Sequence, residues 1–569
     1  MILTQHSIQL KFNNHTSQPF FPANGCCQGC PLSMLLYVIY NAPLIRIANP
    51  NDPNECIVSF VDDTTLLARG KDFKKAHRII KNMMECTNGV FEWSSTYNSP
   101  LEMNKHALIN FTQSATKAGD ATILKLRQKI QGTTHMHPVK ASPNAKLLGV
   151  ILDARLSWTA QHERVHEKAV KWTAAFKRFT KPVISIPMKE AQKLYNAIAV
   201  PKICYAADIW FTPSGYTKAD THHTGPIGIT SRLKSIQHQV AISITGAMQT
   251  APGDTMIINA NLTPIGIQLK DTSIRAYLQL ASCPNHHPIT RLITRTHTHQ
   301  VRHHRMALHH LASISSINPG NLEKIRTQRY KPSDRTPFRA NIAEMKEESI
   351  KWDKENFNRG MKIYTDGSGQ KGVIGAAAIL YINSTKRGKL YHQLGTARQH
   401  TVFEGELVAL ILGLHLAKEH IKTYPDINIS INNQAAIKSI GNNRAQPAQY
   451  IIDEIKSMIR ELVEEGQCGN HNNCFINTPT SITLTWVAGH MNSLGNEAVD
   501  KLAKAATKFG SSSTNLLPQF LRNNLPISVS ATKQHIKTTT KNKTCVGGNA
   551  QHTTSESEKS TCPSPQRIT

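Results

Sequence analysis

Residues 361–508 alternate between short apolar runs and longer amphipathic runs, and this order restricts the possible fold more than any other feature of the sequence. Runs with strand character are short and rich in β-branched residues, whereas the helical runs repeat their apolar residues every three or four positions. In chain order we expect strands at 363–366, 373–382 and 390–394, a helix at 403–419, a strand at 427–431, two amphipathic helices, a strand at 482–486 and a final helix. This order predicts an α/β domain with a five-stranded mixed sheet and helices on both faces.

Three acidic residues lie in three different elements of this predicted domain. Asp366 ends the first strand, Glu406 lies one turn into the first helix, and Asp500 lies in the last helix. Carboxylates in these places can meet at one edge of the sheet. Two divalent cations held about 3.5–4 Å apart repel each other, so a two-metal centre needs several carboxylates together. The sequence therefore indicates a candidate metal site.

The motifs around these acids extend over the whole of 358–508. They are Tyr364-Thr365-Asp366-Gly367-Ser368, Phe403-Glu404-Gly405-Glu406-Leu407, Asn432-Asn433-Gln434-Ala435-Ala436, Trp486-Val487-Ala488-Gly489-His490 and Gly495-Asn496-Glu497-Ala498-Val499-Asp500. In this order they resemble a type 1 ribonuclease H domain. The resemblance implies cleavage of the RNA strand of RNA–DNA hybrids with two Mg²⁺ ions, for which Mn²⁺ can substitute. It also implies that Asp366 bridges the ions, that Glu406 and Asp500 each hold one, and that His490 assists proton movement or product release.

One position departs from the family pattern. Asn432 stands where the family has a fourth metal-binding acid. An amide oxygen can ligate Mg²⁺ but carries no net charge, so we expect one of the two ions to bind more weakly. Asp426 shares a strand face with Asn432 but lies about 20 Å away along an extended chain, which is too far to replace it.

Several of these residues have simpler explanations that the sequence leaves open. Asp366 could be a turn residue, Asp500 and His490 could be solvated, and Glu404 could be the metal ligand in place of Glu406. Cys468, His471 and Cys474 could suggest zinc, but a fourth ligand is missing and a structural role is the simpler interpretation.

A second acidic motif lies near the start of the chain. Asp62 and Asp63 follow Phe60-Val61 between two short apolar runs, where adjacent carboxylates suit a magnesium site. A glycine-punctuated loop, Gly25–Ser33, lies some thirty residues earlier. Together with Leu148-Gly149-Val150 and the segment 237–246, these motifs resemble the palm and thumb of a non-LTR retrotransposon reverse transcriptase, over roughly residues 1–280.

The resemblance has two gaps. Cys27 and Cys30 replace the usual Pro and Ser of the loop, and the family's third metal-binding Asp would precede the first residue of this chain. We therefore expect Asp62 and Asp63 to form a degenerate polymerase site without polymerase activity. In this region we also expect a hairpin opened by a strand at 8–12, helices at 33–47 and 74–91, and strands at 57–60 and 64–68.

The excess of positive charge points to a polyanionic partner. The chain has 66 Lys and Arg against 38 Asp and Glu, a formal net charge of +28, and residues 116–360 carry +19 of it. Eight His residues between His286 and His310 alternate with Arg, which favours phosphate attraction over a solvated loop or a metal site. We therefore expect RNA–DNA hybrid or RNA as partner. The sequence identifies no protein partner.

Cysteine content and the lack of apolar spans bear on location. The 11 Cys residues form no regular framework, which fits a reducing compartment. The chain shows neither a signal peptide nor an apolar run of about 18–20 residues, so we expect no membrane insertion and a cytoplasmic or nuclear protein.

These observations predict the following domain order: a partial palm at 1–115, a thumb-like helical region at 116–215, a basic connection and linker at 216–357, the ribonuclease H domain at 358–508 and a disordered polar tail at 509–569. The leading functional hypothesis is hydrolysis of RNA–DNA hybrids in a truncated retrotransposon protein, weakened by Asn432. A binding module that does not cut and a decayed element without activity are the alternatives.

Overall fold

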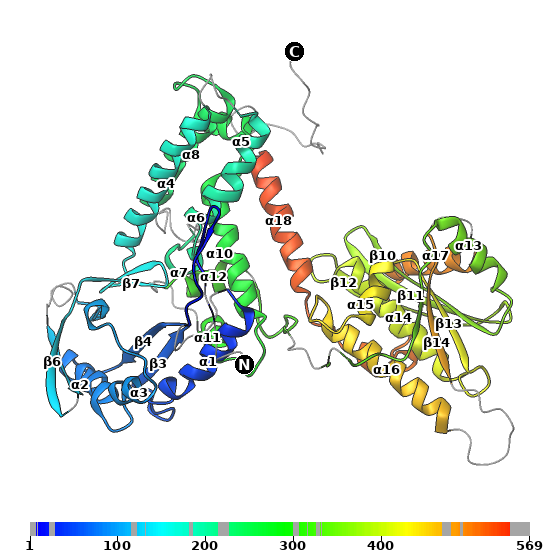
Figure 1. The fold of residues 1–569 in the computed structure, drawn as a ribbon. Coiled ribbons are helices and arrows are strands. Elements are labelled where there is room, and N and C mark those ends of the chain that lie inside the picture. The colour runs from blue at the N-terminus through cyan, green and yellow to red at the C-terminus, as the bar shows by residue number, and fades with distance from the viewer. Residues whose placement is uncertain are drawn as a thin grey trace. The chain divides into compact units, whose positions relative to one another are not determined.

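The computed structural model describes the chain apart from residues 1–6, 8, 22–28, 115–121, 131, 181–185, 214–226, 300–305, 316, 326–329, 332, 469–479, 490–492 and 547–569. The chain divides into two compact units, residues 1–167 and residues 168–569, and each is described by itself (Figure 1). Among the described residues, no helix combines the length and the apolar character needed to cross a membrane.

The first unit consists of small β-hairpins and short helices. Its elements are β1 (Lys11–Phe12), β2 (His15–Thr16), α1 (Pro31–Ile45), β3 (Glu55–Phe60), β4 (Asp63–Ala68), α2 (Phe73–Glu85), α3 (Val90–Thr96), the 3-10 turn η1 (Met103–Lys105), β5 (Ile123–Ile130), β6 (Thr133–Lys140), β7 (Asn144–Leu147) and β8 (Val150–Asp153). All four hairpins are antiparallel. Helix α2 packs on β4, β5 and α3 around a core that contains Met83, Met84 and Trp93.

The single helix expected at 74–91 is two helices. Helix α2 ends at Glu85, Asn88 has φ = +59°, and Gly89 begins α3 as its N-cap. A side chain at Gly89 would lie 2.7 Å from the carbonyl oxygen of Cys86. The close turn therefore requires glycine, and the helical periodicity of the sequence does not register the interruption.

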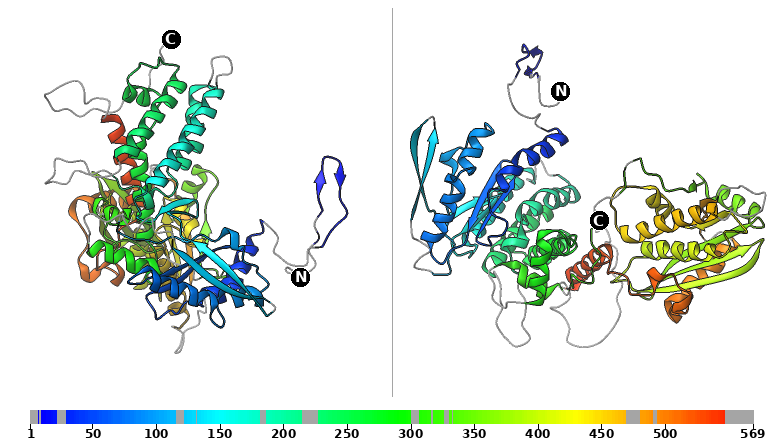
Figure 2. Two further views of the ribbon diagram at one scale, coloured as in Figure 1. Left: turned by 90° about the vertical axis from the view of Figure 1, so that its left-hand side faces the viewer. Right: turned by 90° about the horizontal axis from the view of Figure 1, so that it is seen from below.

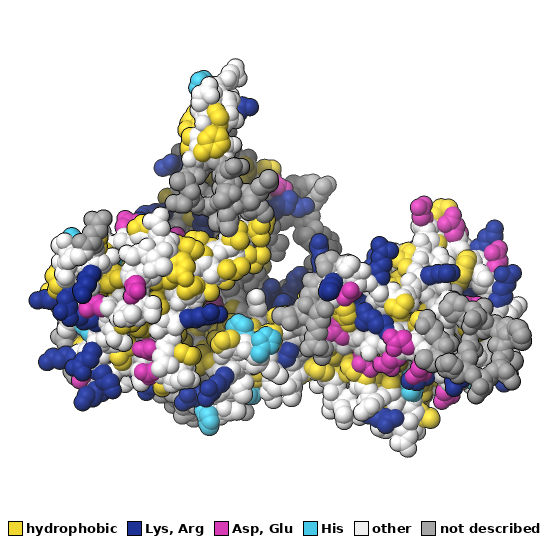
Figure 3. Space-filling model, turned by 60° about the horizontal axis from the view of Figure 1, so that its bottom comes forward, with side chains coloured by type: hydrophobic (Ala, Val, Ile, Leu, Met, Phe, Trp, Pro, Cys, Tyr) yellow, Lys and Arg dark blue, Asp and Glu magenta, His cyan; other side chains and the backbone are white. Residues whose placement is uncertain are grey.

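Helix α1 is apolar on all sides but mostly exposed. Of its residues only Asn41 and Leu44 are buried, whereas Leu35, Val38 and Ile39 are each more than half exposed. Hydrophobic and basic side chains are both exposed on the face of the molecule that Figure 3 shows. The helix starts two residues earlier than expected because Pro31 suits the first helical position.

The second unit begins with a helical region. Its helices are α4 (Thr159–Phe179, which starts before residue 168), α5 (Met188–Leu194), the π-helical turn η3 (Tyr195–Ala199), α6 (Val200–Ile203), α7 (Ala207–Trp210), α8 (Ile227–Thr245), α9 (Gly253–Asn259), α10 (Ile265–Ala281), α11 (Pro288–Thr298) and α12 (Ala307–Ile314). A core around Tyr277, Leu278 and Leu311 joins α10, α11 and α12.

A six-stranded mixed sheet forms the rest of this unit (Figures 1 and 2). Its elements are β9 (Arg339–Asn341), α13 (Lys346–Glu355), β10 (Met361–Gln370), β11 (Val373–Ile382), β12 (Thr385–Thr396), α14 (Val402–Lys418), β13 (Asp426–Ile431), α15 (Gln434–Gly441), α16 (Gln449–Cys468), β14 (Ser481–Trp486) and α17 (Leu494–Phe509). The strand order is β12-β11-β10-β13-β14-β9. Strand β11 runs antiparallel to its two neighbours β12 and β10, whereas β13, β14 and β9 run parallel to β10.

Successive residues of the central strand β10 face opposite sides of the sheet. Ile363 belongs to the large core with α14 and α16, whereas Tyr364 belongs to the smaller core with Val499 and Ala503 of α17. Helices therefore cover both faces, and the five strands expected from the sequence are all present.

Two expectations about the flanking segments are wrong. Residues 339–355 are not a linker, because β9 pairs with β14 as a sixth strand and α13 buries Ser349, Ile350 and Asp353. A strand of three residues is too short to show the alternation of apolar and polar residues, so it could not be predicted from the sequence.

The polar tail expected to be disordered from residue 509 is ordered to residue 546. It forms the 3-10 turns η4 (Thr514–Leu516) and η5 (Gln519–Leu521) and the helix α18 (Val529–Val546). Leu517 and Leu521 enter the core of the sheet, and Ile527 and Val529 pack against the core of the helical region. A few apolar residues thus order a segment whose composition is mainly polar.

Helix α14 lies unusually close to β10 at Gly367. A Cβ atom at this position would lie 2.3 Å from the backbone nitrogen of Glu406 and 2.6 Å from the carbonyl carbon of Gly405. The contact is backbone against backbone, so no rotamer change can relieve it.

We therefore predict that Gly367→Ala lowers the free energy of unfolding by roughly 1–3 kcal/mol or more, as overpacked cores do. Urea denaturation followed by circular dichroism measures the change. Gly441→Ala is the matched control in the same domain, because its Cβ would meet only Phe338 Cζ at 3.8 Å. Equal stability of Gly367→Ala and the unaltered protein would contradict the prediction.

Candidate active site

The parallel pairing of β10 with β13 brings Asp366 and Asn432 together. The register aligns Thr365 with Ile431, the last residue of β13, so Asp366 within β10 lies beside Asn432, the first residue after β13. The Asn432 Nδ2 group donates a hydrogen bond to Asp366 Oδ1. The Trp486 Nε1 group donates to the backbone oxygen of Asn432 at 3.0 Å and holds it from β14.

Glu406 reaches the same edge from α14. Its Oε2 atom accepts a hydrogen bond from the Gly367 backbone N–H at 3.1 Å, directly beside Asp366. Burial raises the pKa of Glu406 well above its usual value, the charge of Asp366 raises it further, and the bond from Gly367 opposes both. Two buried carboxylates thus lie close enough to repel each other.

The oxygen donors at this edge fit one hard divalent cation. A cation between Asp366 and Glu406 would relieve their repulsion, and carboxylate oxygens are ligands that Mg²⁺ prefers. Asn432 could add an oxygen only if its amide turned, because its nitrogen now faces Asp366. In the part of the chain that the structure describes, no three His, Cys, Asp or Glu side chains are grouped to hold a metal ion.

Asp500 has a different partner. Its Oδ2 atom accepts from the Lys504 Nζ group at 2.6 Å, one turn further along α17. Asp500 is no partner in the bonds that join Asn432 to Asp366 and Gly367 to Glu406. Lys504 was not among the predicted site residues, although the i, i+4 spacing of Asp and Lys on a helix is a readable signal for such a pair.

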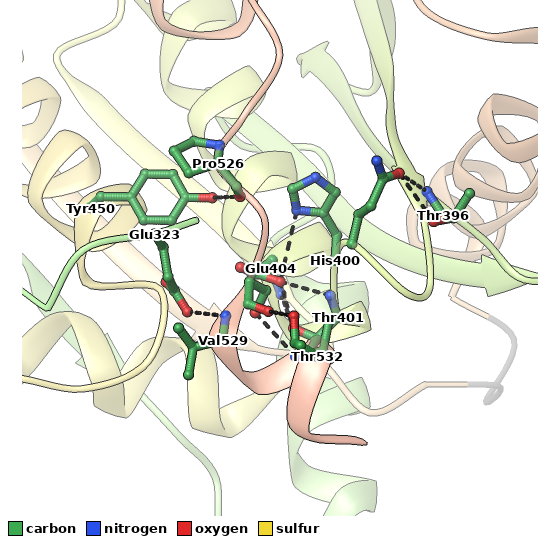
Figure 4. Close-up of polar contacts among 12 residues, drawn as sticks. Glu323, Thr396, His400, Thr401, Glu404, Tyr450, Pro526, Val529 and Thr532 are labelled. Atoms are coloured by element: carbon green, nitrogen blue, oxygen red, sulfur yellow. Dashed lines mark hydrogen bonds and ion pairs between the residues drawn. The ribbon is translucent and has the colours of Figure 1, made fainter. Parts of the chain in front are cut away.

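Glu404 lies near His400, Thr401 and Glu323 (Figure 4). Its Oε2 atom accepts from the Thr401 backbone N–H at 2.7 Å, which closes a capping box at the start of the helix. Burial and the nearby charge of Glu323 raise the pKa of Glu404 to about 7, against the bonds from Thr401. Of the two candidate glutamates, only Glu406 therefore lies beside Asp366.

The remaining predicted ligands lie partly outside the described residues. His490 falls within 490–492, and His471 and Cys474 fall within 469–479, so the histidine role and the zinc alternative are not described by the structure. Of the loop Gly25–Ser33, residues 25–28 lie outside as well, including Cys27.

The Asp62–Asp63 motif forms an exposed turn between β3 and β4. Val61 has φ = +53°, an uncommon conformation for a β-branched residue. The buried Asn41 side chain donates from Nδ2 to the Val61 carbonyl at 2.6 Å and supports the turn from α1. Burial raises the pKa of Tyr37, and the charge of Asp62 raises it further. The structure thus presents both aspartates to solvent.

The basic segment contains a shallow hollow along α11. Arg291, Arg295 and His299 line it together with Thr290 and Thr294. Arginine side chains on one surface suit phosphate. His303 and His304 fall within 300–305 and lie outside the described residues.

Comparison with known proteins identifies two domains. Residues 2–152 match the family model "Reverse transcriptase (RNA-dependent DNA polymerase)", and residues 358–508 match the family model "RNase H". A curated relative, the retrovirus-related Pol polyprotein from type-1 retrotransposable element R1 4 of Nasonia vitripennis, is 21% identical over 230 residues. The match covers 39% of this chain and 54% of the relative, so the chain spans about half the length of that protein.

Solved ribonucleases H are also similar to this chain. RNase H1 from the halophilic archaeon Halobacterium salinarum NRC-1 is 18% identical over 26% of this chain and 96% of its own, with a TM-score of 0.20. LC11-RNase H1 in complex with RNA/DNA hybrid is 14% identical over 26% of this chain and 98% of its own, also with a TM-score of 0.20. The family matches and the Pol relative confirm the two resemblances and the α/β multidomain fold expected from the sequence.

A pH effect on stability follows from the burial of His400 beside Glu404. His400 is 3% exposed, and burial, together with nearby His392, lowers its pKa to about 4. The 4.0 Å contact of its Nδ1 atom with Glu404 Oε2 is therefore made by a neutral imidazole at pH 7.

We predict that His400 makes the folded state less stable as pH falls. Below about pH 6.5 the unfolded chain binds a proton at this position, whereas the folded chain binds it only near pH 4. Between pH 7.5 and 5.0, His400→Gln should therefore lose less stability than the unaltered protein, by on the order of 2 kcal/mol. Melting temperatures of both proteins at the two pH values measure this, and a constant difference between them would refute the idea.

Proposed function

The chain joins a reverse transcriptase domain to a ribonuclease H domain, as non-LTR retrotransposon polyproteins do, and from this we propose that its ribonuclease H domain hydrolyses the RNA strand of RNA–DNA hybrids. The observation that carries the proposal is the meeting of Asp366, Glu406 and Asn432 at one edge of the sheet. These are three of the four residues for which the family resemblance implies a metal-binding role.

Asp366 and Glu406 would hold one Mg²⁺ ion, with Asn432 as a neutral third donor. Asp500 would share the second ion with Asp366 once its carboxylate left Lys504. When bound, such ions activate water for attack on phosphorus and stabilise the leaving oxygen. Mn²⁺ could take the place of Mg²⁺.

The other groups at the site orient these ligands. The Gly367 N–H fixes the Glu406 carboxylate, and Trp486 fixes the backbone of Asn432. By resemblance, His490 would move a proton or help the product leave.

A second candidate function is binding of the hybrid without cleavage. It is favoured by Asn432, which lacks the charge of the usual acid and whose amide group donates to Asp366. We rank it second because Asp366 and Glu406 are both present and adjacent.

The Asn432 position separates the two functions. We expect weak cleavage of a labelled RNA–DNA hybrid in Mg²⁺, and a rate higher by roughly ten-fold or more in Asn432→Asp, since a carboxylate adds a full charge beside the ion. The measurement is single-turnover cleavage on a denaturing gel.

Asn433→Asp is the matched control for this experiment. It adds the same charge one residue later, where Asn433 Oδ1 accepts from the Ala435 backbone N–H as a helix cap that Asp can also provide. This control should leave the rate unchanged. If Asn432→Asp binds the hybrid and does not cut it, the nuclease proposal fails and the binding function takes its place.

Hybrid affinity should also depend strongly on salt because the region 116–360 carries +19. Replacing both Arg291 and Arg295 with Gln should reduce the slope of log K against log salt by about 2 if each contacts one phosphate. Fluorescence anisotropy between 50 and 300 mM KCl, with hybrid as the probe, measures the slope. Lys193→Gln is the control, since Lys193 is paired with Glu190 at 3.0 Å, and an unchanged slope in the double variant would remove α11 from the interface.

A further inference from the structure

Helix α13 precedes residues 358–508, the range that matches the ribonuclease H family, yet it is built into the same domain. Most of its surface is charged and exposed. Its buried face carries two polar residues one turn apart, Ser349 and Asp353, which are each 2% exposed. Buried polar groups need partners, and those of the Asp353 side chain lie on β10 and at the start of α17, the elements that carry Asp366 and Asp500.

Asp353 bonds to two of these elements with its two carboxylate oxygens. Its Oδ1 atom lies 2.5 Å from Lys362 Nζ and accepts from the Tyr364 hydroxyl group at 2.9 Å, both on β10. Its Oδ2 atom accepts from the Ser493 hydroxyl group at 2.6 Å, at the start of α17. The Lys362 ammonium group also lies over the Trp352 ring, 5.1 Å from its centroid.

Ser349 makes a parallel connection to the end of β14. Its hydroxyl group donates to the Trp486 carbonyl at 2.8 Å and accepts from the Ala488 backbone N–H at 3.1 Å. Ala488 and Ser493 are buried residues on either side of residues 490–492. One face of α13 thus fixes the chain both before and after this segment.

The elements that Asp353 joins are those that carry Asp366 and Asp500. Asp366 follows Tyr364 by two residues on β10, and Asp500 follows Ser493 by seven residues on α17. Figure 1 shows α13 beside α17. At Gly495 the helix and the strand are in direct contact, since a Cβ there would lie 2.2 Å from the Tyr364 ring.

We infer that Asp353, assisted by Ser349, is a positioning residue for hydrolysis: it links β10 to the first turn of α17 and so sets the place of Asp500 relative to Asp366. The inference rests on the proposed function. A buried ion pair often adds little to the free energy of unfolding. Its fixed geometry can nevertheless determine how two elements are placed.

Ser493→Ala is the sharpest test because it removes the contacts of Ser493 with Asp353 and Tyr364 and leaves the contacts between Asp353 and β10 in place. The Lys362–Asp353 ion pair stays intact, and the Ser493 side chain makes no helix-capping bond that the variant would lose. In the full-length chain carrying Asn432→Asp, we expect Ser493→Ala to lower kcat about ten-fold while KM for the hybrid stays within two-fold. Ser493→Thr, which keeps the hydroxyl group, should restore kcat.

Ser439→Ala is the matched control, since it removes a buried hydroxyl group that bonds within α15, to the Ala436 carbonyl, and should leave kcat unchanged. Hydrogen exchange followed by mass spectrometry gives a readout independent of activity, and amides at 494–500 should exchange several-fold faster in Ser493→Ala alone. Unchanged kcat together with unchanged exchange in Ser493→Ala would overturn the inference.

The two proposals can fail separately. If the Asn432→Asp chain with intact Ser493 does not cleave hybrid, the proposed function is wrong, and the exchange measurement decides the link by itself. Faster exchange at 494–500 would then support the link between α13 and α17, and unchanged exchange would overturn it.

Discussion

The parallel pairing of β10 with β13 is the constraint on which the candidate site depends. Because the two strands run in the same direction, the carboxyl end of β13 lies beside the middle of β10, and Asp366 and Asn432 come into hydrogen-bonding contact. The close approach of α14 at Gly367 then adds Glu406 to the same edge. Asp366 lies within β10 and Glu406 within α14, so these two elements hold their side chains in place, whereas Asn432 is the first residue after β13.

Buried charge is used in two different ways in this domain. Asp366 and Glu406 repel each other, which raises the pKa of Glu406 beyond the effect of burial and leaves the pair suited to a cation. Asp353, in contrast, is matched by Lys362 and two hydroxyl groups, so that its carboxylate is satisfied by protein alone. The first arrangement fits chemistry, and the second fits the placement of neighbouring elements.

Segments outside the family match contribute to the ribonuclease H domain. The strand β9 extends the sheet, α13 fixes both β10 and α17, and Leu517 and Leu521 of the C-terminal segment enter the core. Glu323 accepts a hydrogen bond from the Val529 backbone N–H at 2.7 Å, near Glu404 (Figure 4). The domain is therefore larger than residues 358–508.

The sequence by itself determined the order of strands and helices in 361–508, the α/β fold and the family resemblances, because periodicity and short motifs record local structure. It named Asp366, Glu406 and Asn432, yet it could not choose between Glu404 and Glu406 or see that the Asn432 amide group faces Asp366. Only the tertiary structure decided these points, and it alone revealed the bond between Asp353 and Ser493, which are separated by 140 positions. A contact between residues so far apart leaves no local pattern, since each partner is merely one polar residue in its own segment until the fold buries both.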